Sequence, residues 1–239
     1  MKTVLLSMRA WWPALVGSLL FVLLAILLMP YPGIQEDETI FGPPIYHPEL
    51  VPHLKIGAHL IPLMLMTYLG ATKTWLYALI FKFWRPSAAT IRGPVIVIFA
   101  LTIWVLYAVL RMIHSWRAGV AGALILATDP VYVMTGSFGW CNLQNVFMLA
   151  ALGAFLKFHR NKSRLWLAGA MFCTGLWVWD KALALWILSG LVLALLILFP
   201  RETLGHINWA NIGIGLIAFC VGGAAYCLQR GESLSHVAL

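Results

Sequence analysis

Charge is scarce in this sequence. Only 10% of the 239 residues are Asp, Glu, Lys or Arg, and only eight are acidic, whereas soluble domains carry about 25% charged residues. Hydrophobic residues make up 62% of the chain, and the mean hydropathy is +0.89. These values exclude an ordinary soluble domain and predict an integral membrane protein.

Motifs for nucleotides and metals are absent as well. The sequence has no GxxxxGK[ST] loop, no GxGxxG turn and no HExxH pair, so nothing indicates ATP, NAD or zinc chemistry. None of the four cysteines forms a CxxC pair, and we interpret them as small packing residues. No basic stripe interleaved with aromatic residues accompanies the net charge of +8. We therefore expect no nucleic-acid partner; the positive charge suits loops facing an anionic membrane surface.

Long apolar runs predict an all-α, polytopic fold with about seven transmembrane helices in a single membrane domain, residues 1–239. Several runs lie near the lower limit of about 17 residues for a spanning helix. The first run is longer than the core of a signal peptide and is not followed by an A-x-A site, so we expect a retained span. The predicted spans are 11–29, 94–110, 119–138, 143–158, 165–179, 182–199 and 207–228.

The distribution of Lys and Arg predicts the orientation. Lys2 and Arg9 precede the first span, and the segment "KFHRNKSR", residues 157–164, carries four basic residues. Basic loops concentrate on the cytoplasmic side. We therefore expect a multi-pass protein of the inner or plasma membrane with a cytoplasmic N-terminus.

A large outer loop, residues 30–93, follows the first span. Within it, residues 60–84 are long enough to cross the bilayer, but Lys73 would then lie mid-membrane at a cost of about 2.5–3.5 kcal/mol. A crossing would also place the two basic segments on opposite sides. We favour interfacial helices over 53–84, broken near Gly70, and an eighth crossing is the alternative.

The stretch "QEDETIF" gathers three adjacent carboxylates, Glu36, Asp37 and Glu38, where the first span ends. Because such groups repel one another, at least one should bind a proton or a divalent cation more readily. A carboxylate of this kind can deprotonate a hydroxyl nucleophile. The alternative is a solvated loop whose acids keep the segment out of lipid.

Three segments carry a resemblance to a known family. They are "EDETIF" with Asp37 and Glu38, "LILATDPVYVMTGSFGW" with Asp129–Pro130, and "AGAMFCTGLWVWDKALALW" with Lys181. Together with the order of spans and outer loop, they resemble the GT-C membrane glycosyltransferases. Within that group the sequence is most similar to the superfamily of protein O-mannosyltransferases and lipid A aminoarabinose transferases.

This resemblance implies transfer of a sugar from a polyprenyl-phosphate donor to a lipid, glycan or protein acceptor on the outer face of the membrane. Asp37 would be the general base that activates the acceptor hydroxyl, with inversion at the anomeric carbon, and Glu38 would support it. The leaving lipid phosphate needs cations, for which the candidates are Lys181, Lys73 and Arg92. For each of the three, ordinary snorkelling toward headgroups is the alternative.

Asp129 is open to two interpretations: a polar group at a helix end or part of the wall of the active-site cavity.

Two departures from the family pattern favour a rival function. Gly139 stands where relatives often carry an acidic residue, and the chain stops soon after its last span. It therefore resembles a membrane core, a truncated paralogue or a gene fragment, and the rival is an inactive scaffold. A small transporter or flippase subunit fits less well, because the spans hold almost no charge.

Overall fold

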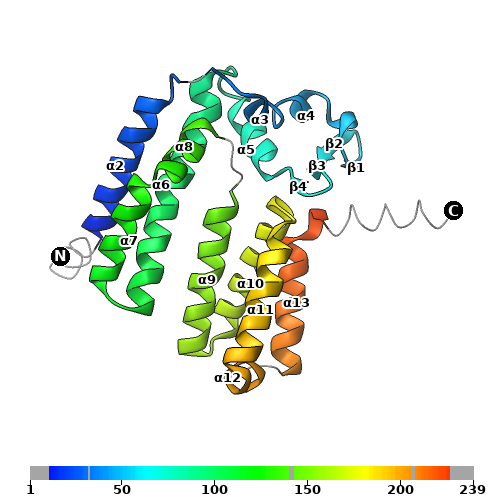
Figure 1. Cartoon of the computed structure of the whole chain (residues 1–239). Helices are drawn as coiled ribbons and strands as arrows, with labels where there is room; N and C mark the ends of the chain where they lie inside the picture. Colours follow the sequence, from blue (N-terminus) through cyan, green and yellow to red (C-terminus); the bar gives the residue numbers. More distant parts are fainter. Residues whose placement is uncertain (1–10, 32, 140–142, 206–207, 227–239) are drawn as a thin grey trace, which may run out of the picture. The chain divides into compact units, whose positions relative to one another are not determined.

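The computed structural model describes residues 11–31, 33–139, 143–205 and 208–226. It divides into two compact units. Unit 1 consists of Met1–Ile40 and Tyr77–Leu149, and unit 2 consists of Phe41–Leu76 and Ala150–Leu239. Both units are mainly helical (Figure 1). The expectation of a helical fold is confirmed, with short strands added to it.

Helices coincide with every predicted span, and the span predicted at 119–138 is covered by two helices. The helices over the predicted spans are α2 (Trp12–Leu28), α6 (Ala88–Ile113), α7 (Trp116–Thr128), α8 (Pro130–Phe138), α9 (Gln144–Asn161), α10 (Arg164–Asp180), α11 (Ala184–Leu198) and α13 (Trp209–Gly222). The other helices are α3 (Glu36–Thr39), α4 (Pro43–Tyr46), the 3-10 turn η1 (Pro48–Leu50), α5 (Thr72–Ile80) and α12 (Pro200–Gly205).

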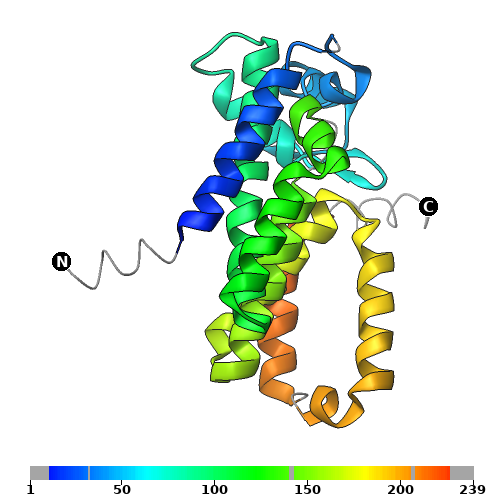
Figure 2. The same cartoon turned by 60° about the vertical axis from the view of Figure 1, so that its left-hand side comes forward.

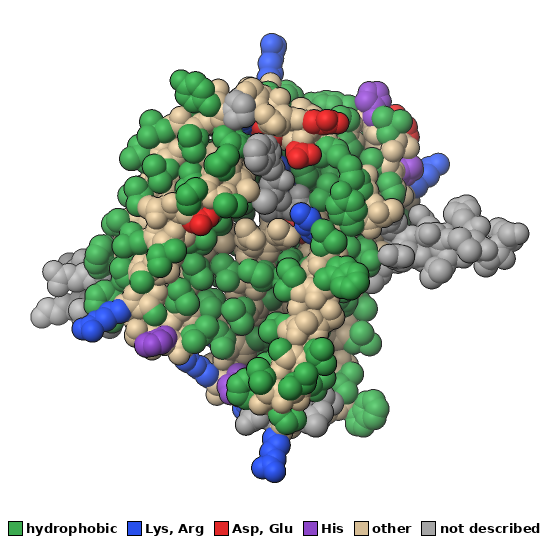
Figure 3. All heavy atoms as spheres, in the orientation of Figure 1, with side chains coloured by type: hydrophobic (Ala, Val, Ile, Leu, Met, Phe, Trp, Pro, Cys, Tyr) green, Lys and Arg blue, Asp and Glu red, His purple; other side chains and the backbone are tan. Residues whose placement is uncertain are grey.

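By length and composition, α6 is long and apolar enough to cross a membrane, and the bent pair α7–α8 passes the same test when taken as one span. Three further apolar helices, α2, α11 and α13, are shorter. Hydrophobic side chains cover much of the visible helical surface (Figure 3). In the described residues, then, one or two helices meet the requirement for a span. The count of seven spans and the single membrane domain stay predictions. The orientation also stays a prediction, and two of the basic residues behind it, Lys2 and Arg9, lie outside the described residues.

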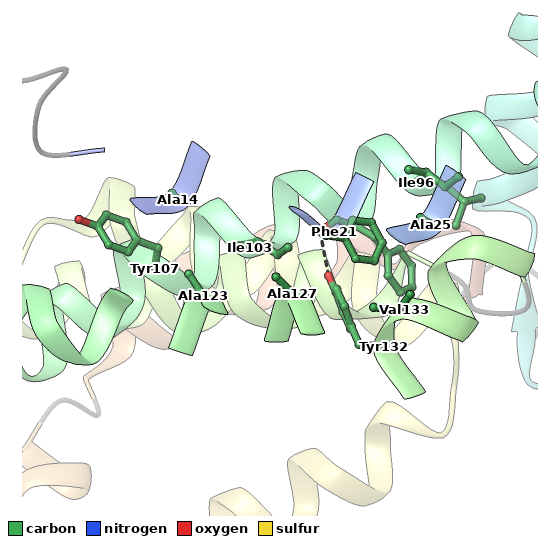
Figure 4. Packing of buried hydrophobic residues seen from close by; sticks show 12 residues of the cluster. Ala14, Phe21, Ala25, Ile96, Ile103, Tyr107, Ala123, Ala127, Tyr132 and Val133 are labelled. Carbon is green, nitrogen blue, oxygen red and sulfur yellow. Dashed lines mark hydrogen bonds between the residues drawn. The ribbon is translucent and has the colours of Figure 1, made fainter. Parts of the chain in front are cut away.

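The core of unit 1 is built where α2 packs against α6 and α7 (Figure 4). The rings of Phe21 and Phe99 stack with centroids 6.2 Å apart. The hydroxyl of Tyr132 donates to the carbonyl oxygen of Phe99 at 2.8 Å, so α8 is fixed to α6. Where α2 meets α7 the residues are small: a Cβ atom added to Gly17 would lie 3.3 Å from the carbonyl oxygen of Ala123.

The bend between α7 and α8 is 59°. Pro130 has no N–H with which to continue α7, and its ring disfavours helical geometry at the preceding residue. Asp129 accordingly has an extended ψ of 122°, and its Oδ1 accepts a hydrogen bond from the backbone N–H of Tyr132 at 2.7 Å. The Asp-Pro pair therefore ends one helix and begins the next.

The prediction of interfacial helices over 53–84 is wrong for its first half. Residues 53–70 form two antiparallel hairpins, which pair β1 with β2 and β3 with β4. The strands are β1 (His53–Ile56), β2 (His59–Pro62), β3 (Met64–Met66) and β4 (Leu69–Gly70).

Local sequence explains the first hairpin. The residues joining its strands are Gly57 and Ala58, and Gly57 has φ +60°, which suits a two-residue hairpin turn. Gly70 is the last residue of β4, and α5 begins at Thr72. Gly70 therefore separates the hairpins from one helix, and not two helices as expected.

In unit 2, α10 and α13 pack so closely that their backbones are in contact. A Cβ atom added to Gly175 would lie 2.3 Å from the carbonyl oxygen of Phe219, and one added to Gly222 would lie 2.2 Å from that of Phe172. Small residues allow such an approach between apolar helices. By contrast, α11 stands apart from α10 and α13 in Figure 2, and its side chains, such as Trp186 at 78% exposure, are mostly uncovered.

The close approach of α10 and α13 gives a first prediction. Gly175→Val should destabilise the protein by about 1–3 kcal/mol or more, because its side chain would overlap backbone atoms that cannot move aside. Thermal unfolding of the purified protein in detergent measures the effect. The matched control is Gly169→Ala on the same helix, where an added Cβ meets nothing within 4 Å. Equal melting temperatures for the two variants would contradict the packing described here.

Candidate functional site

An ion pair between Arg92 and Glu38 lies at the centre of the site in unit 1. The guanidinium Nε donates to Glu38 Oε2 at 2.7 Å, and Nη2 donates to Oε1 at 2.6 Å. Both side chains are almost completely buried, at 1% and 0% exposure. Such a two-pronged arrangement is the strongest geometry available to an arginine and a carboxylate.

Arg92 also satisfies the backbone where α2 ends. Its Nη1 donates to the carbonyl oxygen of Met29, and its Nη2 donates to that of Gly33 at 3.1 Å. The ring of Phe138 lies 5.5 Å from the guanidinium carbon. All three guanidinium nitrogens are thus bonded within unit 1, so Arg92 fixes the chain between α2 and α3.

Local sequence places both partners. Glu38 is the third residue of α3, where its carboxylate accepts from the backbone N–H of Gln35 at 3.1 Å in a capping box. Arg92 lies in the second turn of α6, which begins after the N-cap Ser87. Beside them, the Tyr77 hydroxyl donates to the carbonyl oxygen of Ile91 at 2.8 Å. Burial, with the Glu38 charge as a smaller cause, raises the pKa of Tyr77 well above its usual range, so this hydroxyl stays neutral.

The three carboxylates of "QEDETIF" differ in their surroundings. Glu38 is buried, whereas Glu36 and Asp37 are exposed. Within the described part of the chain, no hydrogen bond or ion pair engages the Asp37 carboxylate. Asp37 is therefore an accessible acid that directly precedes an anchored one.

A second polar cluster lies in unit 2, at the start of α5. Lys73 is fully buried, and its Nζ lies 4.3 Å from the ring centroid of Phe41, a cation–π contact. The neighbouring Thr72 hydroxyl donates to the carboxylate of Asp180, which is also fully buried. Asp180 is not among the site residues expected from the sequence. An acid that closes a long apolar run just before a lysine was the signal available for it.

Lys181 follows α10 as its C-cap and is partly exposed. It forms an antiparallel β-bridge with Leu69, and the N–H of Ala182 donates to the carbonyl oxygen of Tyr68 at 2.9 Å. The backbone of Lys181 is thus fixed by the β3–β4 hairpin.

The two remaining positions of interest are at helix ends. Asp129 is the N-cap of α8, which fits the helix-end interpretation; a role in a cavity wall stays a prediction. Gly139 is the C-cap of α8 with φ +65°, a left-handed conformation for which glycine is the usual choice. Backbone geometry therefore accounts for glycine at this position.

For the residues that the structure describes, no three His, Cys, Asp or Glu side chains come together in a way that could hold a metal ion. The divalent cation expected at Asp37 and Glu38 stays a prediction. The same applies to the catalytic and phosphate-binding roles expected of Asp37, Glu38, Lys73, Arg92 and Lys181.

Comparison with known proteins gives one match. The family model described as dolichyl-phosphate-mannose-protein mannosyltransferase matches residues 71–222. The matched region includes Lys73, Arg92, Asp129 and Lys181, whereas Asp37 and Glu38 precede it. No curated protein and no solved structure shows a significant match to the chain.

The Arg92–Glu38 pair gives the second prediction. Arg92→Met should lower the free energy of unfolding by about 3–5 kcal/mol, because it leaves the Glu38 carboxylate buried without its partner. The double variant Arg92→Met/Glu38→Gln should lose less free energy of unfolding than the two single variants lose together. Thermal or denaturant unfolding of the four proteins measures this coupling.

The control is Arg117→Ala, which removes an exposed arginine of the same unit and should change stability by less than about 0.5 kcal/mol. Strictly additive losses for Arg92→Met and Glu38→Gln would show that the two side chains do not stabilise the fold as a pair.

Proposed function

Because the chain belongs to the dolichyl-phosphate-mannose-protein mannosyltransferase family, we propose that it transfers a glycosyl group from a polyprenyl-phosphate-linked donor to an acceptor on the extracytoplasmic face of the membrane. The family is one of membrane glycosyltransferases, so transferase chemistry follows from membership. The donor, the acceptor face and the residue roles below are the proposal.

The observation that supports it best is the contrast between Asp37 and Glu38. A general base must be reachable by the acceptor and must be held steadily. Asp37 is exposed, while the next residue is locked to Arg92 by two hydrogen bonds. Asp37 is thus an accessible carboxylate on a backbone segment that a buried ion pair anchors, and Glu36 on the same segment is exposed as well.

In the proposed reaction, Asp37 takes the proton of the acceptor hydroxyl as its oxygen attacks the anomeric carbon. A new glycosidic C–O bond forms, and the bond from that carbon to the donor phosphate oxygen breaks. The electron pair of the broken bond leaves with the polyprenyl phosphate. Attack opposite the leaving group inverts the anomeric configuration.

The phosphate gains negative charge as it leaves, and nearby cations lower the energy of that step. We assign this role to Lys181, which is partly exposed. Lys73 is fully buried against Phe41, so contact between Lys73 and the phosphate stays a separate prediction. Arg92 has its guanidinium nitrogens bonded to Glu38, Met29 and Gly33, so its proposed part is to orient the segment that carries Asp37. Direct contact between Arg92 and the phosphate stays a separate prediction.

The third prediction tests the base. Asp37→Asn should reduce glycosyl transfer by about 10²–10⁴-fold, because an amide cannot accept the hydroxyl proton. The dissociation constant of the donor should change little. Transfer is measured with a radiolabelled polyprenyl-phosphate sugar and membranes that contain the protein.

Glu36→Gln is the matched control, since it removes an exposed carboxylate from the same short helix, and it should retain nearly full activity. Equal activity in Asp37→Asn and wild type would exclude Asp37 as the base. A wild-type protein without transfer activity would favour the inactive scaffold.

The fourth prediction concerns the face of the membrane. In a variant without native cysteines, Thr39→Cys should react with a membrane-impermeant maleimide in intact cells, and Ser163→Cys should react only after the membrane is opened. The reason is the basic segment around Ser163, which favours the cytoplasmic side. Labelling of both positions from the same side would refute the proposed orientation.

A further inference from the structure

Positive charge gathers in unit 2 where α9 ends and α10 begins. We call residues 157–164 the basic turn; it contains Lys157, His159, Arg160, Lys162 and Arg164. The sequence has no acidic residue from 130 to 179. Helix α9 therefore supplies no acid to offset this charge, and α10 supplies only its last residue, Asp180. The proposed glycosyl transfer uses none of the side chains in the basic turn.

The backbone makes this turn short. The N–H of Lys162 donates to the carbonyl oxygen of Phe158 at 2.7 Å, and Lys162 has a left-handed φ of 52°, a common way to end a helix. Helix α10 then begins at Arg164. The turn lies at the lower end of both helices in Figure 1. Its four basic residues from 159 to 164 are all exposed, so their charge is at the surface.

Lys157 is held against the beginning of α10. Its Nζ lies 3.9 Å from the ring centroid of Trp166, a cation–π contact. Because the indole ring has no net charge, the contact fixes the ammonium group without neutralising it. Lysine stems lie along apolar surface while the charged end stays at the polar boundary, and tryptophan is enriched at membrane–water interfaces. The contact between Lys157 and Trp166 therefore suits the headgroup layer of a bilayer.

Apolar side chains lie on the surface of both helices beside the basic turn. Phe155 on α9 is 36% exposed, and Leu165 and Phe172 on α10 are 79% and 38% exposed. The spans predicted from the sequence at 143–158 and 165–179 meet at this turn. If α9 and α10 cross the bilayer as predicted, the apolar side chains contact acyl chains and the basic turn lies at the level of the phosphates.

We propose that the basic turn is a binding site for anionic phospholipids. Lys157 and Arg164 bind the headgroup phosphate, and Trp166 fixes the direction of Lys157. Each Lys or Arg close to an anionic membrane surface contributes up to about a fivefold gain in affinity, so two or more of them favour anionic over zwitterionic lipid. The inference rests on the predicted crossing of α9 and α10 and is independent of glycosyl transfer.

The experiment measures the lipid preference beside the turn in the whole protein. In a variant without native cysteines, Asn161→Cys carries a fluorophore, and the protein is reconstituted into phosphatidylcholine vesicles. Quenching is recorded with nitroxide-labelled phosphatidylglycerol and, separately, with nitroxide-labelled phosphatidylcholine. The apparent association constant of phosphatidylglycerol should be at least about tenfold greater. Salt at about 1 M, where the screening length is about 3 Å, should reduce this ratio to less than about twofold.

Matched variants locate the preference. Lys157→Gln/Arg164→Gln should reduce the ratio to less than about threefold. The control Lys82→Gln/Arg85→Gln removes the same charge from exposed residues of unit 1 and should stay within about twofold of the unsubstituted protein.

The role of the ring is tested separately. Trp166→Leu, which keeps every cation, should reduce the ratio about two- to fivefold, and Trp166→Phe should restore most of it. Melting temperatures confirm that each variant is folded, and the salt measurement needs no substitution in the turn.

Equal quenching by the two lipids would overturn the proposal and leave the turn to a soluble anionic partner. A preference that both double variants reduce to the same extent would come from the total charge of the protein, and it would overturn the proposal as well. A preference that about 1 M salt leaves unchanged would show that the charges of the turn are not its cause. None of these outcomes depends on whether the protein transfers a sugar.

Discussion

Unit 1 depends on the placement of a single guanidinium group in a site closed to water. Arg92 bonds to Glu38 and to the carbonyl oxygens of Met29 and Gly33, so one side chain connects the end of α2, the following loop, α3 and the second turn of α6. A buried charge pair contributes little net stability against an apolar alternative, but separation of its partners is costly. The pair therefore specifies one arrangement of these segments, and the direction of Asp37 follows from that arrangement.

The buried charged side chains of unit 2 follow the same physical rule. Asp180 and Lys73 are both buried in an apolar surrounding, and each is accompanied by a specific contact, the Thr72 hydroxyl and the Phe41 ring. A buried charge stays with its contact because a buried charge without a partner carries a large desolvation cost. In each unit, one buried acid of a sequence with only eight acidic residues therefore bonds to a side chain of another element.

Much of the helical framework could be predicted from the sequence, because in lipid a chain must satisfy its backbone groups internally and long apolar runs leave little choice but a helix. The exception was residues 53–70. There the apolar content suggested helices, while the alternation in "HLKI", followed by Gly57 in a tight turn, was the signal for a hairpin. The Asp129–Pro130 pair indicated the end of a helix. It did not indicate that a second helix begins there at an angle of 59°.

Most residues of the candidate site could be predicted from the sequence, but the contacts between their side chains could not. The cluster of carboxylates drew attention to Asp37 and Glu38, and the resemblance drew it to Arg92. That Arg92 bonds to Glu38, 54 residues away in sequence, could not be read from either segment alone, since nothing local specifies which distant cation an acid meets. The same limit hid the contact between Thr72 and Asp180. Sequence spacing predicts neighbours on one helix, whereas these contacts join separate elements.

The exposed helix α11 has a consequence for the surrounding lipid. Its 15 residues span only about 22 Å at about 1.5 Å per residue, against a hydrocarbon core of about 30 Å. A short apolar helix that crosses the membrane draws the two leaflets together locally. Since α11 begins three residues after Lys181, a bilayer-spanning α11, as predicted from the sequence, would bring lipid headgroups toward that lysine. The proposed binding of the donor at Lys181 would then depend on bilayer thickness.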